Sequence, residues 1–214
     1  MGTMSDLRVI YDMTGANLGS VTIPPGVGVA LYTTGSAGVP ASPAQIAAHP
    51  GAVLIDQAPV NTAADELADA ADFENGALTL ADLPGWYRGA KANYDTAKRP
   101  GQRWPAIYAD SSNLTPVANE LVSAGITSGP RLWVAHWDLP IADAIDMLTG
   151  SGGPFPVIGV QVHNAGTHDV SLFLASWLDA VSRAPAPPPP APITALLVTA
   201  SRTVTSTDGG HTYH

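Results

Sequence analysis

Two acidic side chains that flank one aromatic residue form the part of this sequence best suited to chemistry. Asp72 and Glu74 stand on either side of Phe73. In a β-strand, side chains alternate between the two faces, so both carboxyl groups would point the same way. Two neighbouring carboxyl groups drive their pKa values apart, and one then stays protonated as a general acid while the other stays ionised. In a helix, residues two apart lie on different faces, so this interpretation requires a strand.

The residues just before this pair favour a different structure. Positions 65–72 are rich in alanine and acidic residues, which by intrinsic propensity favour a helix. The strand patterns on both sides point the other way. We therefore predict a strand through Asp72, against the local propensity.

Short apolar runs that end in a polar residue recur along the chain, as expected of strands buried on both faces. They cover residues 7–11, 27–32, 52–55, 105–108, 132–135 and 157–162. Predicted helices alternate with them, at 42–48, 80–98, 115–124, 141–148 and 171–181, several marked by a proline at the start or a glycine past the end. This alternation predicts an α/β fold with parallel strands. About 180 residues fit a small, irregular TIM-like (β/α) barrel, with a doubly wound open sheet as the alternative.

The composition changes sharply near residue 184, which divides the chain into three predicted parts. Residues 1–183 form the barrel, and residues 184–192 are a proline-rich linker of semi-rigid, extended type. Residues 193–214 are β-prone with one turn signal. Because a lone hairpin is only marginally stable, we expect this tail to dock on a partner or to be disordered.

Charge and composition exclude several functions. The 214 residues carry 18 acidic and 9 basic side chains, a net charge of −9, which disfavours nucleic acid and suits a neutral glycan. No apolar run is long enough to span a membrane, and no signal peptide is seen, so we expect synthesis in the cytoplasm and action after release or within a particle. The absence of cysteine excludes disulfides and thiolate metal ligands.

Polar residues that end parallel strands meet at one mouth of a barrel. The candidate polar residues are Asp12, Asp56, Asp72, Glu74, Asp110, His136, Asp138, Gln161, His163 and Asp169, and the aromatic ones are Tyr11, Tyr32, Tyr108, Trp133 and Trp137. Carboxyl pairs with stacking aromatics are typical of glycosidic cleavage. Taken one by one, such acids are more often helix caps, and aromatics within apolar runs are more often core.

Other chemistries find less support in the sequence. His163 and His168 lack a third ligand at metal-binding spacing, so we expect no metal. The glycine-rich segment 150–153 has no phosphate-binding lysine, and no Gly-x-Ser-x-Gly occurs. We expect no cofactor.

Four features follow one another in a familiar order. They are Asp12 at the end of the first strand, the Asp72–Glu74 pair, the run Leu132-Trp133-Val134-Ala135, and Gln161 followed by Asp169-Val170-Ser171. Over residues 7 to 182 this order resembles the glycoside hydrolase family 25 lysozymes, and more closely an uncharacterised branch from actinobacteria and their phages. The resemblance implies a short β/α barrel that cuts the glycan strands of peptidoglycan.

The resemblance also implies roles for individual residues. Glu74 would be the general acid, Asp72 would assist it, and Asp12 and Asp169 would position the sugar and tune the acids. From their positions at or near the strand ends, and not from the resemblance, we expect substrate contacts from Tyr11, Tyr32, Asp56, Tyr108, His136, Trp137, Gln161 and His163. The sequence departs from the family pattern at Val160 and Val162, because the family has aromatic residues on both sides of the glutamine. No cell-wall-binding repeat follows the barrel either. The alternative function is a non-catalytic barrel of a virion or cell surface, attached through residues 193–214 to a protein partner.

Overall fold

The computed structural model describes residues 6–34, 39–57, 68–74, 78–95, 104–150 and 153–179. The predicted linker, residues 184–192, and the predicted tail, residues 193–214, lie outside these ranges. So do residues 96–98 of the predicted helix 80–98 and most of the alanine-rich stretch before Asp72.

Eight strands form a closed barrel in which chain neighbours are also spatial neighbours. They are β1 (Leu7–Met13), β2 (Gly28–Tyr32), β3 (Val53–Asp56), β4 (Ala70–Asp72), β5 (Ala106–Asp110), β6 (Arg131–Ala135), β7 (Val157–Asn164) and β8 (Asp169–Leu174). Each pair from β1–β2 to β6–β7 is parallel. This confirms the predicted α/β class and the small TIM-like barrel, and it excludes the open sheet.

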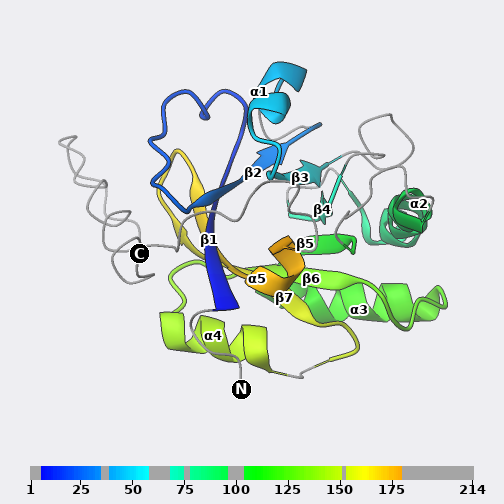
Figure 1. Cartoon of the computed structure of the whole chain (residues 1–214). Coiled ribbons are helices and arrows are strands. Elements are labelled where there is room, and N and C mark those ends of the chain that lie inside the picture. Colours follow the sequence, from blue (N-terminus) through cyan, green and yellow to red (C-terminus); the bar gives the residue numbers. More distant parts are fainter. Residues whose placement is uncertain are drawn as a thin grey trace, which may run out of the picture.

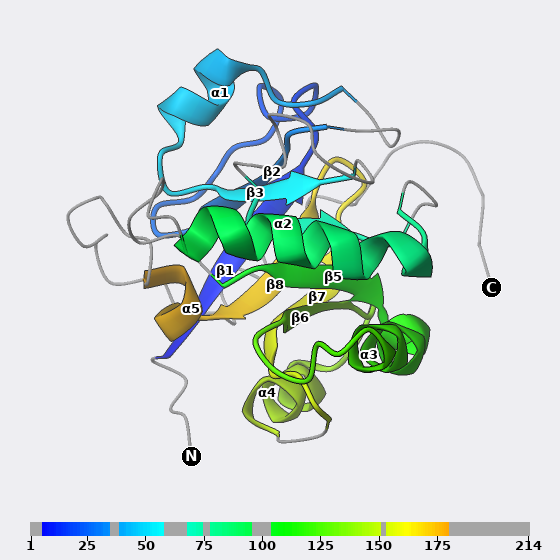
Figure 2. The same cartoon turned by 90° about the vertical axis from the view of Figure 1, so that its right-hand side faces the viewer.

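Helices surround this barrel and also close one end of it. α1 (Pro43–Ala48), α2 (Leu83–Asp95), α3 (Leu114–Ser123) and α4 (Ile141–Thr149) lie outside the ring of strands, whereas α5 (Ala175–Asp179) lies over its middle (Figure 1). Short 3-10 turns, Leu80–Asp82 and Ser111–Asn113, lead into α2 and α3. Viewed from the side, α2 lies in front of the strands, between β3 and β5 (Figure 2). No helix in the described ranges is long and apolar enough to cross a membrane.

The last strand corrects two predictions. Residues 171–181 are not one helix, because β8 runs to Leu174 before α5 begins. β8 is also antiparallel to both of its neighbours, β1 and β7, so the barrel is not wholly parallel. Pairing explains the strand, because β1 and β7 would otherwise expose unpaired backbone groups. The short turn between Asn164 and Asp169 explains its direction, because parallel neighbours need a long crossover connection. Its side chains alternate accordingly, with Phe173 inside the barrel and Leu172 in the outer core.

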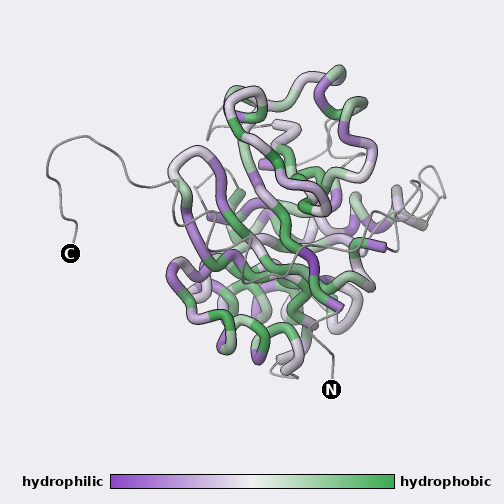
Figure 3. Tube along the Cα trace, turned by 60° about the vertical axis from the view of Figure 1, so that its left-hand side comes forward, coloured by the Kyte–Doolittle hydropathy of each residue, from purple (hydrophilic) through white to green (hydrophobic). Residues whose placement is uncertain are grey.

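Two apolar layers hold the barrel together. An outer cluster packs between strands and helices, and an inner cluster fills the barrel. In the inner cluster the Trp177 ring of α5 stacks on Phe173 with ring centroids 5.5 Å apart. Figure 3 shows the apolar strands at the centre of the fold. Because Leu174 pairs with Leu7, α5 closes the end where the parallel strands begin. The functional side chains are therefore sought at the opposite end.

Candidate active site

The barrel interior changes from apolar to acidic towards the end where the parallel strands finish. On β1 the inward residue Ile10 is followed two positions later by Asp12, and on β4 Ala70 is followed by Asp72. Asp12 pairs with Asp169 across the antiparallel β1–β8 ladder. Glu74 follows just after β4. Asp12, Asp72, Glu74 and Asp169 thus form one acid cluster, in which burial and then the charges of the other three raise the pKa of Asp12.

Asp72 is the member of the acid cluster best supplied with hydrogen-bond donors. Its side chain is 1% exposed. Gln57 Nε2 donates to Oδ2 at 2.6 Å, and the backbone N–H of Glu74 donates to Oδ1 at 2.7 Å. Burial raises the pKa of Asp72, while these two bonds and one from the Tyr32 hydroxyl lower it. The donors therefore stabilise the ionised form of this carboxyl group.

Glu74 has fewer hydrogen bonds to offset the effect of burial on its pKa. Burial, and then the neighbouring charge of Asp72, raise the pKa of Glu74 to about 7, and the Tyr108 hydroxyl bond offsets this only in part. Asp110 and Asp169 add smaller repulsions in the same direction. Glu74 therefore holds a proton close to neutral pH beside a carboxyl group whose ionised form is stabilised by three hydrogen bonds. Such a pair separates the roles of general acid and charged stabiliser.

Asp12 and Asp169 form a second carboxyl pair, on the far side of the acid cluster. Burial and then the charge of Asp169 raise the pKa of Asp12 well above its usual range. Burial raises the pKa of Asp169 to about 6, and the Gln161 side chain limits that rise. Asp12 Oδ2 and Asp169 Oδ1 are both buried and have no hydrogen-bond partner among the described residues.

Tyr108 and Gln161 connect Glu74 with Asp169, because Tyr108 contacts Glu74 and Gln161, and Gln161 contacts Asp169. Both side chains are fully buried, and the Tyr108 hydroxyl contacts the Gln161 amide oxygen and the Glu74 carboxyl group. Burial raises the pKa of Tyr108, which keeps it a neutral donor. The sequence predicts substrate contacts for Tyr32, Tyr108 and Gln161. In the structure all three contact the acids, and Tyr32 also lines a polar cavity.

Two predicted substrate contacts lie on the wrong face of their strands. Tyr11 packs in the outer core, with its ring 4.3 Å from the His168 ring. Asp56 is fully buried outside the barrel, where it accepts a hydrogen bond from Trp86 Nε1 at 3.0 Å and another from the Thr34 hydroxyl. Period-two alternation is the reason, because Tyr11 adjoins the inward Asp12 and Asp56 adjoins the inward Ile55.

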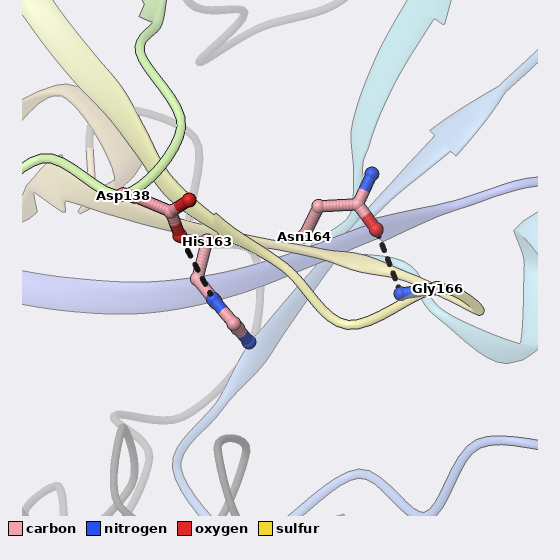
Figure 4. A network of polar contacts seen from close by, with 4 residues as sticks. All are labelled: Asp138, His163, Asn164 and Gly166. Atoms are coloured by element: carbon pink, nitrogen blue, oxygen red, sulfur yellow. Dashed lines mark hydrogen bonds and ion pairs between the residues drawn. The ribbon is translucent and has the colours of Figure 1, made fainter. Parts of the chain in front are cut away.

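The remaining predicted residues lie at the mouth, Asp110 and His163 at the ends of β5 and β7 and the others in the loop after β6. His136 is exposed and Trp137 is 58% exposed, which leaves the indole free to stack on a sugar. His163 Nδ1 lies 3.8 Å from Asp138 Oδ1 (Figure 4). Asp110 accepts a bond from Ser112 N at 2.7 Å, and the bonds to Ser112 lower its pKa. Asp110 is thus a cap that also adds charge near Glu74.

Gln57 is a functional candidate that the sequence reasoning missed. It is 2% exposed and donates to Asp72. A signal for it existed, because the inward positions Val53 and Ile55 of β3 place residue 57 on the same face. For metals, the described residues contain no group of three or more His, Asp or Glu side chains arranged to hold an ion.

Comparisons with known proteins add one structural likeness. The chain is similar to a bacterial lysozyme from Streptomyces coelicolor, with 14% identity and a TM-score of 0.44, over 81% of this chain and 96% of that one. No protein-family model and no curated protein sequence matches the chain. The chemistry below is therefore argued from the side chains.

Proposed function

We propose that this protein is a glycoside hydrolase that cleaves the glycan strands of peptidoglycan, with Glu74 as the general acid. One observation carries the proposal: Glu74 stands directly beside Asp72, whose carboxylate accepts bonds from Gln57 and from the Glu74 backbone, and burial raises the pKa of Glu74 to about 7. Glycosidic bond cleavage requires this combination of one protonated and one ionised carboxyl group.

The reaction assigns a step to each acid. The Glu74 O–H donates its proton to the glycosidic oxygen while the bond from that oxygen to the anomeric carbon breaks. Asp72, held by Gln57 and the Glu74 backbone N–H, stabilises the positive charge that develops on the sugar. Water then adds its oxygen to the anomeric carbon, and its released proton passes to a carboxylate of the acid cluster.

Peptidoglycan is proposed as the substrate because the acids stand in the order that the sequence resemblance describes. Asp12, the Asp72–Glu74 pair, Gln161 and Asp169 all come from interior positions at one end of the barrel. Trp137, with its exposed indole, offers a sugar-stacking surface in the adjoining loop. The net charge of −9 suits a glycan better than an anionic polymer.

The direct test is product analysis. The full-length protein is incubated with purified peptidoglycan, the new reducing ends are reduced with borohydride, and the alditols are identified by mass spectrometry. We expect new ends to accumulate with time, and the alditol found identifies the bond that was cut. No new ends on walls of several chemotypes between pH 4 and 8 would contradict the proposal and favour the alternative, a barrel kept for binding at a virion or cell surface.

A further inference from the structure

A polar cavity of about 190 Å³ lies beside the acid cluster. Thr14 and Asn17 line it from the segment after β1, and Asn164 and Thr167 line it from the β7–β8 hairpin. Asp12 and Asp169 line it as well. The cavity is smaller than the pockets that enclose drug-sized ligands, which limits its occupant to one small polar group or sugar unit.

Two carboxyl oxygens at this cavity have no hydrogen-bond partner among the described residues. Asp12 is 2% exposed, and its Oδ2 has no hydrogen-bond partner in the part of the chain that the structure describes. The same holds for Asp169 Oδ1. Buried polar atoms in folded proteins are almost always paired, with protein, water or ligand. These two unpartnered oxygens, on residues that line the polar cavity, are the observation that points to a ligand.

The walls of the cavity are fixed by hydrogen bonds of their own. Asn17 Nδ2 donates to the Thr167 carbonyl oxygen at 2.9 Å, which ties the segment after β1 to the hairpin. Asn164 Oδ1 accepts a bond from Gly166 N at 2.7 Å across the hairpin tip (Figure 4). A site with walls held in this way loses little conformational entropy when a ligand binds.

No lysine or arginine lines the cavity among the described residues. Its one histidine, His168, has a pKa lowered by burial and by nearby His163, which keeps the imidazole neutral. Above about pH 6, where Asp169 is ionised, the cation that pairs with it must therefore come with the ligand. An ammonium group brings a positive charge and three N–H donors, whereas a hydroxyl or an acetamido N–H brings one donor and no charge.

We propose that this cavity binds the protonated amino group of a de-N-acetylated amino sugar within the glycan strand. The inference rests on the proposed function, because the strand must also reach Glu74 to be cut. It makes the enzyme selective for glycans in which some amino groups are free.

Binding tests this without turnover. In the full-length Glu74→Gln variant, titration calorimetry compares chitotetraose with its fully de-N-acetylated counterpart and with a short lysine-containing peptide. We expect the amino tetrasaccharide to bind at least about tenfold more tightly than the acetylated one. Asp169→Asn, combined with Glu74→Gln, should bring that ratio to within about twofold. Asp12→Asn is a second variant with the same expectation, should the first fold poorly.

The matched control is Asp143→Asn, which removes one exposed acid from α4, outside the cavity lining. It should keep the preference. Any of three results would overturn the inference. The acetylated sugar could bind equally or more tightly, the preference could survive in both Asp variants, or the lysine peptide alone could bind. Reducing-end release by the wild-type protein is scored separately, so an active enzyme without amine preference refutes this site and leaves the proposed function standing.

Discussion

At the scale of single residues, the candidate site depends on an uneven supply of hydrogen-bond donors to neighbouring carboxyl groups. Asp72 receives three donors, and Glu74 receives only the Tyr108 hydroxyl while facing the charge of Asp72. The difference in pKa between two such groups is what distinguishes an acid from a charged stabiliser. The supporting residues that create the difference should therefore be visible in the pH dependence of the rate.

Gln57→Met keeps the size of the side chain and removes the donor to Asp72. We expect the pKa of Asp72 to rise, because its ionised form loses a buried hydrogen bond. The acidic limb of the pH–rate profile should move to higher pH, and the free energy of unfolding should fall by about 1–3 kcal/mol. An acidic limb that stays in place would contradict the role given to Gln57.

Tyr108→Phe removes the hydroxyl that lowers the pKa of Glu74. The basic limb of the profile, above which Glu74 has lost its proton, should then move to higher pH. Tyr94→Phe is the matched control, because Tyr94 lies on α2 with its ring 5.1 Å from the Trp104 ring and plays no part in the acid cluster. A similar shift in both variants would argue against a specific bond.

Some of these residues were predictable from the sequence and some were not. Asp12, Asp72, Glu74 and Asp169 were predicted to lie close together because they end strands or follow them, and the structure brings them into one electrostatic group. Their catalytic roles remain predictions. The predicted substrate contact of Tyr11 was wrong because it used the position along the chain and ignored the alternation of side chains. A residue next to an inward acid must face outward.

At the scale of elements, local propensity and tertiary pairing gave opposite answers twice. β4 forms despite an alanine-rich, acidic approach, because the edges of β3 and β5 offer it backbone partners. The same cause turned the predicted helix 171–181 into β8 followed by α5. Closure of the barrel supplies β1 and β7 as backbone partners for β8, and residues 171–174 alone do not predict this pairing. The alternation around the chain was predictable; the antiparallel last strand was not.

Gly159→Ala tests the packing of β7 against β8. A Cβ at this position would lie 2.6 Å from the Phe173 ring, so we expect a loss of about 1–3 kcal/mol in the free energy of unfolding. Gly85→Ala is the control of opposite sign, because it lies exposed in α2 with no atom within 4 Å of the added carbon. That helix substitution should stabilise by roughly 0.5–1 kcal/mol. Denaturant unfolding measures both, and equal effects would contradict the barrel packing.

At the scale of the whole molecule, the acid cluster ties stability to pH. Burial raises the pKa values of Asp12, Asp72, Glu74 and Asp169 above their ordinary values, and the charges of neighbouring acids raise those of Asp12 and Glu74 further. The folded state therefore binds more protons than the unfolded chain at intermediate pH, and these groups lower stability as the pH rises. For Glu74 the loss falls between its ordinary value near 4.5 and about 7.

Glu74→Gln removes this penalty, so the variant should be more stable than the wild type at pH 8 and about equally stable at pH 4. Partial exposure of Glu74 screens the effect, so we expect a gain of about 1–2 kcal/mol. Urea unfolding at the two pH values measures the difference. Asp143→Asn, on the surface of α4, should show no comparable gain. A variant less stable than the wild type at pH 8 would contradict the claim that ionised Glu74 destabilises the folded protein.

The central claim is that Glu74 supplies the proton for glycosidic cleavage, and one comparison tests it most directly. Reducing-end release from purified peptidoglycan is measured near pH 6 for the wild type and for Glu74→Gln, which keeps the shape and removes the proton. We expect the wild-type rate to fall by a factor of about 10² to 10⁴ in the variant, which remains folded. A folded variant with wild-type rate, or a wild type without activity on any wall, would contradict it.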